Sequence, residues 1–217
     1  MNSEAASVML IDDHPLLRKG LRQLLEYEDD LDVVAEASSG KEAIPIAVEL
    51  DPDLIILDLN MQGMDGLATL QALRKEGVTS RIVMLTVSDA DEDVVQAITL
   101  GADGYLLKDM EPEQLLEQIR RAVTGKMVLS ESVAAVLATA LRKPGPKPNA
   151  ELNSLTNREY EILSLIAKGM SNKVIARELD ISDGTVKVHV KHLLKKLGLR
   201  SRVEAAVWMV NQQGAKA

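Results

Sequence analysis

The sequence predicts a parallel α/β domain followed by a small all-α domain. Three patterns lead to this prediction. Before residue 125, short aliphatic runs alternate with stretches of helical period, as in repeated strand–helix units. The strand-like runs are apolar almost throughout, which is typical of parallel strands covered by helices on both faces. After a segment rich in proline, the apolar period is helical for the remainder of the chain.

The first domain is expected to contain five strand–helix units. The strands are expected at Val8–Ile11, Val33–Ala35, Leu54–Leu57, Ile82–Leu85 and Tyr105–Leu107. The helices are expected at Pro15–Tyr27, Lys41–Leu50, Leu67–Lys75, Glu92–Leu100 and Pro112–Thr124. Proline suits the first turn of a helix, which fits Pro15 and Pro112. Ser39 and Glu42 have the spacing of a capping box, which places Pro45 inside the second helix and predicts a kink.

A proline-rich segment marks the domain boundary. Pro144, Pro146 and Pro148 with Gly145 cannot continue a helix and indicate an extended spacer. We therefore expect a first domain at 1–127, a connecting helix and linker at 128–150, and a second domain at 151–217. Four helices are expected in the second domain: one from Thr156 to Gly169, then Asn172–Glu178, Asp183–Leu197 and Arg202–Gln212. Capping boxes are expected at Thr156 with Glu159 and at Ser201 with Glu204.

Composition and charge narrow the class of protein. The chain contains no cysteine, which excludes disulfides and thiolate metal sites and fits a reducing compartment. There is no signal-peptide pattern and no apolar run of about eighteen residues, so we expect a soluble cytoplasmic protein. Residues 1–149 carry 14 Lys and Arg against 26 Asp and Glu, whereas residues 150–217 carry 11 against 7. An acidic first part and a basic second part suggest two functions, the second with nucleic acid.

Polar residues follow the predicted strands of the first domain. These residues are Asp12, Asp13, Asp58, Thr86 and Lys108. Ligands of open parallel sheets bind outside the carboxyl ends of the strands, where all five would meet. Clustered carboxylates suit Mg²⁺, a lysine and a hydroxyl could hold phosphoryl oxygens, and Asp58 could act as a nucleophile. Each residue alone is more often a turn former or a helix cap, but the five together favour a site.

The segments "LIDDHP", "LIILDLNM…GMDG", "MLTVSD" and "GADGYLLKDM" resemble the receiver domain of two-component response regulators. The resemblance implies a flavodoxin-like (βα)5 fold in which Asp58 accepts a phosphoryl group from a histidine kinase. It implies the following roles: Mg²⁺ binding by Asp13, Asp58 and the backbone carbonyl of Asn60, with Asp12 acting through water; Lys108 beside the phosphoryl group; Thr86 and Tyr105 as switch residues. One departure is Gln62, where many receivers have a proline that would stiffen the loop.

In the second domain, the expected helix Asp183–Leu197 has two different faces. Val186, Val190, Leu193 and Leu197 form an apolar stripe. The opposite face carries Lys187, Val188, Lys191, His192 and Lys195, which suits contact with phosphates and base edges. Asn172 and Lys173, at the start of the preceding helix, could contact phosphate. A solvated face is the commoner reason for such lysines, but no acidic residue lies between Lys187 and Lys196.

The segment from Leu155 to Val210 resembles the LuxR-type helix-turn-helix domain, and the two domains together are similar to the NarL subfamily of response regulators. This resemblance implies a transcription factor that is not an enzyme. It would be phosphorylated by a membrane-bound sensor histidine kinase and would bind inverted half-sites of double-stranded DNA as a homodimer, with Val207 and Trp208 near the dimer contact. RNA polymerase is a further partner that the resemblance implies. The subfamily implies nitrate- and nitrite-responsive control of genes for anaerobic respiration.

The cationic face of the expected helix Asp183–Leu197 is the predicted recognition face, and the helix is the predicted recognition helix. The opposite charges of the two parts suggest that the unphosphorylated receiver masks it. Three alternatives stay open. The same architecture could answer a different signal, or the protein could bind DNA independently of phosphorylation, with the receiver serving for dimerisation. A haloacid-dehalogenase-like phosphatase is a distant third, because that class needs a second aspartate where this chain has Asn60.

Overall fold

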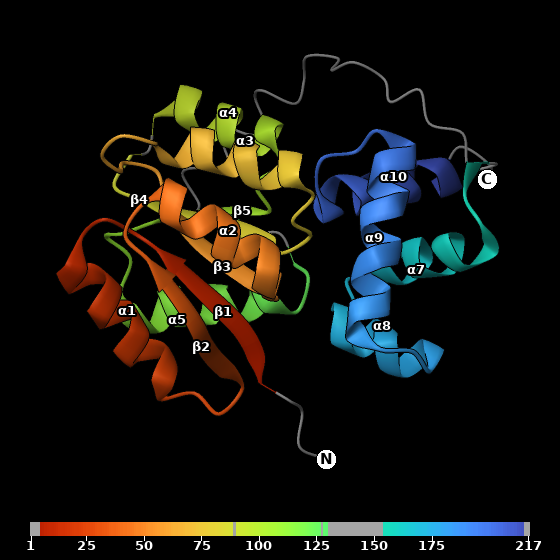
Figure 1. Cartoon of the computed structure of the whole chain (residues 1–217), viewed down its shortest axis with the longest axis horizontal. Coiled ribbons are helices and arrows are strands. Elements are labelled where there is room, and N and C mark those ends of the chain that lie inside the picture. The colour runs from red at the N-terminus through yellow and green to blue at the C-terminus, as the bar shows by residue number, and fades with distance from the viewer. Residues whose placement is uncertain (1–4, 89, 127, 130–153, 215–217) are drawn as a thin grey trace.

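The computed structural model describes residues 5–88, 90–126, 128–129 and 154–214 (Figure 1). These residues form a sheet domain, up to Leu129, and a helical domain that begins at Ser154. The predicted connecting helix and the linker prolines lie outside the described residues. Within the described chain, no helix has both the length and the apolar character needed to cross a bilayer.

The sheet domain is built on six parallel strands in the order β2-β1-β3-β4-β5-β6. Their bounds are β1 Ala6–Ile11, β2 Leu31–Ala37, β3 Leu54–Asp58, β4 Arg81–Thr86, β5 Gly104–Leu107 and β6 Val128–Leu129. Every residue of β3 and β4 is buried, as the continuous apolar runs predict for central parallel strands. The predicted parallel sheet is confirmed.

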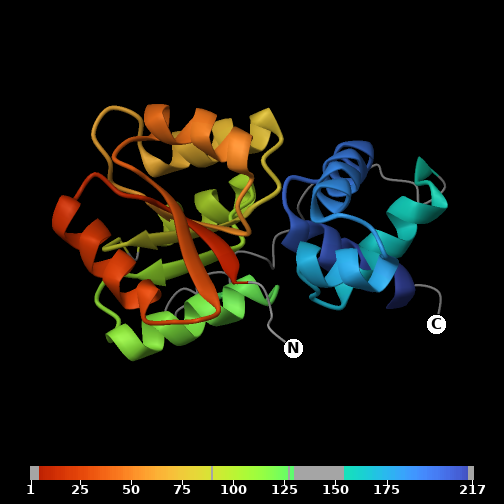
Figure 2. The ribbon, with the colours of Figure 1, turned by 60° about the horizontal axis from the view of Figure 1, so that its bottom comes forward.

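Five helices cover the two faces of the sheet (Figure 2). Their bounds are α1 Pro15–Glu26, α2 Gly40–Leu50, α3 Gly66–Glu76, α4 Asp91–Leu100 and α5 Pro112–Val123. Helices α1 and α5 pack on one face through Leu21, Leu25, Leu115 and Ile119. Helices α2, α3 and α4 pack on the other, where Ala43 and Ala47 are among the core residues. The two cores hold the strands in register, so that their carboxyl ends meet at one edge.

Two details of this domain differ from the predictions. Val128 and Leu129 form β6 beside β5, although the sequence places them in a connecting segment. A strand of two residues is too short to give a periodic signal. At α2, the Ser39 side chain accepts the Glu42 backbone N–H as predicted, but the Glu42 carboxylate accepts from Ser38 instead of from Ser39. The predicted capping box is therefore only half formed, and Pro45 lies inside the helix as expected.

The helical domain contains four described helices: α7 Asn157–Ala167, α8 Asn172–Leu179, α9 Asp183–Leu197 and α10 Arg202–Gly214. Its capping box at Thr156 and Glu159 is confirmed. Glu159 is buried, and burial alone would raise the pKa of its carboxyl group. Hydrogen bonds from Lys196 and Thr156 outweigh burial and lower that pKa below its usual value.

Candidate functional site

An acidic pocket lies at the carboxyl ends of the strands. Asp58 is the last residue of β3 and Asp12 directly follows β1; their exposed fractions are 2% and 3%. The Nζ atom of Lys108, just after β5, lies 2.8 Å from Asp12 Oδ2 and 3.0 Å from Asp58 Oδ2. Buried carboxylates need a compensating positive charge, which this lysine supplies. The three side chains predicted to meet at this edge do so.

Asp13 and His14 border the same pocket. The His14 Nδ1 atom lies 2.9 Å from Asp13 Oδ1 and 3.3 Å from Asp12 Oδ1. One possible ligand atom from each of Asp12, Asp13, His14 and Asp58 lies within 4.8 Å of the others. Asp13 Oδ1 and Asp58 Oδ2 are buried and accept no hydrogen bond from the described residues, although His14 and Lys108 lie at ion-pair distance. Such a group of carboxylate oxygens could hold a hard divalent cation.

The loop after β3 closes the pocket through backbone groups. The Gln62 N–H donates to Asp13 Oδ2 at 2.9 Å, and the Asn60 N–H donates to Asp58 Oδ1 at 3.3 Å. A proline at position 62 has no N–H and could not make the first bond. The loop returns to α3 at Gly66, where an added Cβ atom would lie 2.2 Å from the carbonyl oxygen of Asp58. Gln62, which departs from the family pattern, therefore orients a carboxylate of the pocket.

The switch residues predicted on β4 and β5 meet at one loop. The Thr86 hydroxyl, fully buried at the end of β4, accepts the Ser88 N–H at 3.1 Å and the Asn60 amide at 3.4 Å. Tyr105 is also fully buried, and its hydroxyl donates to the Ser88 carbonyl at 3.0 Å. Ser88 is thus held from two sides, by a residue at the pocket and by the tyrosine behind it.

In the helical domain, α9 has the two faces that its sequence predicts. Val186, Val190 and Leu193 are fully buried in the core. No acidic residue lies between Lys187 and Lys196, but two lysines of this helix form ion pairs with carboxylates outside that segment. Lys187 Nζ lies 3.0 Å from Asp183 Oδ2 one turn earlier, and Lys196 Nζ lies 2.7 Å from Glu159 on α7.

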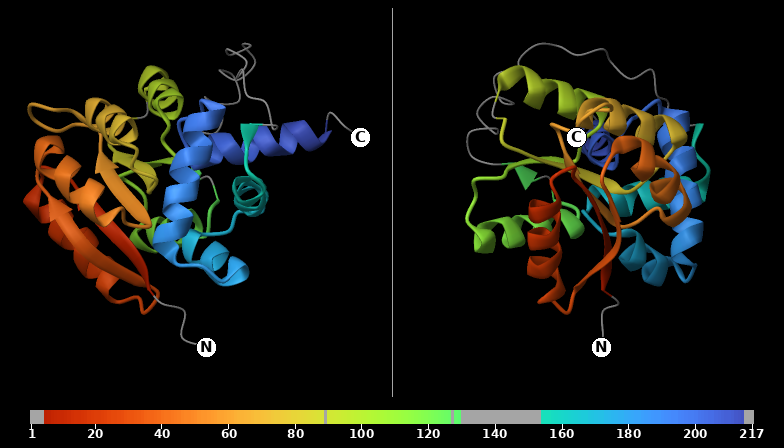
Figure 3. Two further views of the ribbon diagram at one scale, coloured as in Figure 1. Left: turned by 45° about the vertical axis from the view of Figure 1, so that its right-hand side comes forward. Right: turned by 60° about the vertical axis from the view of Figure 1, so that its left-hand side comes forward.

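Helix α9 lies beside the sheet domain (Figure 3), and much of the predicted recognition face lines cavities between the two domains. The Lys191 ammonium donates to the Glu76 carbonyl at the end of α3, at 3.1 Å. An added Cβ atom at Gly77 would lie 2.4 Å from Lys191 Cε, so the end of the lysine side chain lies directly against this glycine. Lys187 and Val188 line a cavity of about 140 Å³ between the domains. His192 is exposed and does not line the cavities described between the domains.

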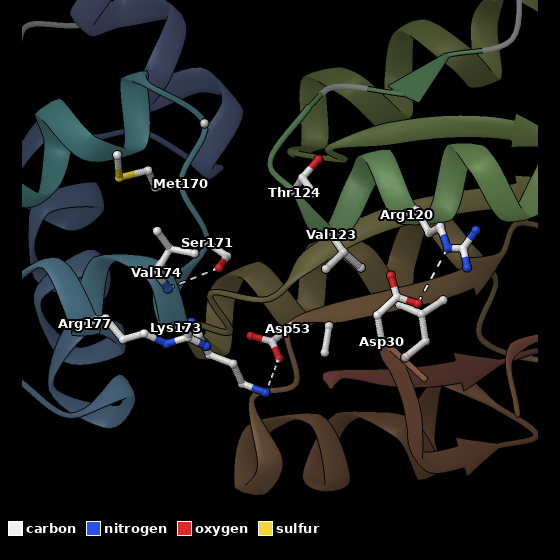
Figure 4. Close-up of a pocket in the computed structure, with 13 residues that line it drawn as sticks. Asp30, Asp53, Arg120, Val123, Thr124, Met170, Ser171, Lys173, Val174 and Arg177 are labelled. Atoms are coloured by element: carbon white, nitrogen blue, oxygen red, sulfur yellow. Dashed lines mark hydrogen bonds and ion pairs between the residues drawn. The ribbon is translucent and has the colours of Figure 1, made fainter. Parts of the chain in front are cut away.

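The start of α8 also contacts the sheet domain, as Figure 4 shows. The Lys173 ammonium donates to the Ala5 carbonyl at 2.6 Å and lies 3.4 Å from Asp53 Oδ2, just before β3. Asn172 is buried and its side-chain oxygen accepts from Arg202. Asn172 therefore holds α10 against α8, and its side chain is not exposed to DNA in this arrangement.

Two arginines are buried where the domains meet. Arg81, at the start of β4, donates to carbonyls at the end of α5, and Arg202 donates to Asn172 and to the Met170 carbonyl. Burial first, and then the like charge of Arg81, lowers the pKa of Arg202 to about 9, while nearby aspartates including Asp53 act in the opposite direction. The contact between the domains thus buries two arginines, whose charges nearby aspartates offset.

Comparisons with known proteins match both domains. Residues 8–120 match the family described as the response regulator receiver domain, and residues 153–209 match the LuxR family of bacterial regulatory proteins. This chain is a LuxR-family response regulator.

Its relatives cover almost its whole length. The nitrate/nitrite response regulator NarL of Escherichia coli (strain K12) is 57% identical over 208 residues, which are 96% of each chain. A nitrate/nitrite response regulator homologue of Haemophilus influenzae is 53% identical over 94% of this chain and 96% of that protein. This response regulator is a NarL-like transcription factor.

Solved structures give the same family. The response regulator ChrA of a heme-sensing two-component system is 36% identical, with a TM-score of 0.52, and the match covers 97% of this chain and 99% of ChrA. The response regulator RcsB in complex with DNA is 25% identical, with a TM-score of 0.57, and the match covers 95% and 98% of the two chains. The RcsB–DNA complex supports DNA binding by the helical domain of this response regulator.

The predicted dimer residues separate in the structure. Val207 on α10 is 56% exposed, whereas Trp208 is only 7% exposed and packs in the core of the helical domain. Trp208 is therefore a core residue of the helical domain, and of the two residues expected near the dimer contact only Val207 is exposed. The sequence reasoning also missed His14 and Asp53. His14 is adjacent to Asp13, but Asp53 shows its role only when the other domain is in place.

Proposed function

We propose that Asp58 accepts a phosphoryl group from a sensor histidine kinase, and that this modification frees the recognition helix for DNA. The observation that carries the proposal is the position of Asp58 Oδ2, 3.0 Å from Lys108 Nζ in a pocket with two further carboxylates. A carboxylate oxygen is competent to attack phosphorus and form an acyl phosphate. The ammonium group of Lys108 is placed to balance charge on the transferred group.

Asp13 and Asp58, together with the backbone carbonyl of Asn60, are the proposed ligands of Mg²⁺, with Asp12 acting through water. When bound, Mg²⁺ neutralises charge on the phosphoryl oxygens during transfer. Asp13 Oδ1 and Asp58 Oδ2 are buried and accept no hydrogen bond from the described residues, which supports this assignment. The Gln62 N–H binds the other oxygen of Asp13 and so orients that carboxylate.

The Thr86 hydroxyl is the proposed sensor of the phosphoryl group. In the unmodified chain it accepts the Ser88 N–H, and its own hydrogen remains available to a phosphoryl oxygen on Asp58. If the Thr86 hydroxyl moved toward that oxygen, its hydrogen bond from the Ser88 N–H would be pulled or broken. The Ser88 carbonyl also accepts the hydrogen bond of the Tyr105 hydroxyl, so the tyrosine would be affected as well. Both proposed switch residues therefore act on the start of α4.

Masking of the helix-turn-helix is the second half of the proposal. Lys173 and Lys191 donate to oxygen atoms of the sheet domain, so neither can contact a DNA phosphate in this arrangement. Phosphorylation would shift the balance toward a form in which these contacts are broken. The released protein would bind inverted half-sites as a homodimer, in which Val207 is available to a second copy.

By analogy with the named relatives, we propose that the kinase is a membrane-bound sensor that responds to nitrate and nitrite. The regulator would act in the cytoplasm, contact RNA polymerase and control genes for anaerobic respiration. The chain carries no residue assigned to signal recognition, so a different signal is the alternative. We assign it no enzymatic turnover beyond slow loss of its own phosphoryl group. Asn60, in place of the acid–base aspartate of haloacid-dehalogenase-like phosphatases, argues against that class.

The experiment that tests this function combines labelling and DNA binding. Wild-type protein and Asp58→Asn are treated with acetyl phosphate and Mg²⁺, and the covalent product is measured by intact mass. Wild type should gain one phosphoryl group and bind DNA more tightly, whereas Asp58→Asn should do neither. Equal labelling of the two proteins, or labelling without any change in DNA affinity, would contradict the proposal.

A further inference from the structure

A second cleft between the domains has the properties of a ligand site. Its volume is about 640 Å³, within the range of roughly 300–1,000 Å³ of small-molecule sites. It lies between the end of α3, with the loop that follows, and the α9 helix with the turn that leads to α10. Val78, Leu100, Leu194 and Leu199 give it apolar walls. The cleft is remote from the acidic pocket, because it lies at the end of α3 opposite the one that faces Asp58.

The polar lining of this cleft is strongly cationic. Its cations are Arg74, Lys75, Lys191, Lys195 and Arg200, and its one acidic side chain is Glu76. Arg74 is neutralised by Asp103 at 2.6 Å, but the other four cations have no carboxylate partner among the described residues.

Two of these cations, Lys75 and Lys195, have no hydrogen-bond or ion-pair partner within the described chain. Within the described residues, the Lys191 ammonium and the Arg200 guanidinium donate only to backbone carbonyls, those of Glu76 and Thr99. Like charges gathered between two domains repel one another and weaken the docked arrangement. An anion placed among them would remove this repulsion and bridge the domains.

We propose that this cleft binds a compact polyanion that carries two or more phosphate groups, and that the bound ligand holds the two domains together. Lysine ammonium groups with free N–H donors suit phosphate oxygens, and they are contributed by both domains. Because the cleft exists only when the domains are docked, the ligand favours the docked form. The consequence for DNA binding rests on the proposed masking, whereas binding of the polyanion does not.

Lys75 allows a sharp test, because it belongs to the sheet domain and is not a DNA contact. Inorganic tripolyphosphate is titrated into the unphosphorylated full-length chain by calorimetry, without Mg²⁺. The proteins are wild type, Lys75→Gln and the matched control Lys41→Gln, an exposed receiver lysine at the start of α2. Thermal unfolding verifies that all three proteins are folded.

We expect one binding site per chain in wild type, about fivefold weaker affinity in Lys75→Gln, and no change in Lys41→Gln. Equal affinity of wild type and Lys75→Gln would overturn the proposal, because it would mean that the anion binds only to the exposed lysines of α9. So would several weak sites per chain that both variants leave unchanged.

A parallel DNA titration separates this proposal from the proposed function. Tripolyphosphate should weaken DNA binding by wild type more than by Lys75→Gln, since it locks the docked form only when the whole site is present. If calorimetry shows the Lys75 dependence but the two DNA titrations respond alike, the ligand site stands and the proposed masking fails.

Discussion

The ion pair between Asp53 and Lys173 offers a direct test of masking. Asp53→Asn keeps the size and shape of the side chain and removes its charge. The variant can still accept hydrogen bonds from Ser7, whose N–H and hydroxyl both donate to Asp53 Oδ2 at 2.9 Å. Lys173 keeps its bond to the Ala5 carbonyl but loses the carboxylate 3.4 Å away. The substitution therefore weakens one contact between the domains without disturbing either core.

The size of the effect follows from the burial of this pair. Its side chains are 9% and 20% exposed, for Asp53 and Lys173, so it is screened less than a surface pair. A value of about 1 kcal/mol is reasonable, at the upper end for exposed pairs and well below that for fully buried ones. This corresponds to about a fivefold increase in the ratio of open to docked forms. While the docked form predominates, the apparent dissociation constant for DNA falls by the same factor.

Fluorescence anisotropy with a labelled DNA site, in the absence of acetyl phosphate, measures this change. Removing a negative charge also increases general attraction to DNA, so Asp32→Asn is the matched control. Asp32 is exposed on β2, and its side chain has no ion-pair or hydrogen-bond partner within the described chain. We expect a clear gain in affinity for Asp53→Asn over Asp32→Asn. The same affinity for both variants would refute the masking contact.

Three further predictions concern single residues. Gln62→Pro should lower Mg²⁺ affinity several-fold in a metal titration, because it removes the N–H that holds Asp13, whereas Gln62→Ala keeps that N–H and should match wild type. Glu159→Gln should lower the free energy of unfolding of the helical domain by about 1 kcal/mol at neutral pH, because it removes the charge that binds Lys196 and Thr156. The lowered pKa of Glu159 means that its stabilisation is present above the ordinary carboxyl pKa and is lost as the pH falls through the lowered value, so acid-unfolding curves of the variant and wild type should converge. Trp208→Ala should lower the free energy of unfolding of the helical domain by about 3–5 kcal/mol in urea, because Trp208 is buried in its core. Val207→Ala should change the same free energy by less than about 0.5 kcal/mol, because Val207 is exposed. Similar losses for the last two variants would contradict the burial difference between them.

The sequence predicts those features that depend on local patterns. The strands are recognisable because central parallel strands are apolar on both faces, and β3 and β4 are buried along their whole length. Asp58, Asp12 and Lys108 can be placed together because parallel strands end at one edge of a sheet. The capping box at Thr156 is likewise encoded in four adjacent residues.

Features that depend on how side chains pack between distant segments, without a rule of sheet topology to place them, are not predicted. Asn172 and Lys173 have the same sequence context, yet one is buried against Arg202 and the other is bound by the sheet domain. Trp208 and Val207 are neighbours on α10, and only the packing of α10 on α7 and α9 decides which of them is buried. Strand β6 exists because β5 offers it an edge. None of these contacts leaves a periodic signal.

The position of α4 explains how a change at Asp58 could reach contacts at the far side of the domain. The loop before α4 contains Ser88, which Thr86 and Tyr105 both hold. At the other end of the helix, the Thr99 carbonyl accepts from Arg200 of the helical domain. A helix moves largely as a unit, so a displacement that begins at Ser88 would be carried over its ten residues, about 15 Å, to the contact with Arg200.

The contact of Asp53 with Lys173 is placed differently, because it lies at the amino end of β3, a strand buried along its whole length. No described element like α4 connects Ser88 to Asp53, so phosphorylation has no comparable route to this contact. It follows that Asp53 should set the resting ratio of open to docked forms, whereas α4 should carry the response to phosphorylation. Asp53→Asn should therefore raise DNA affinity before and not after acetyl phosphate treatment. An equal gain in both states would mean that the Asp53 contact survives phosphorylation and that α4 alone does not open the protein.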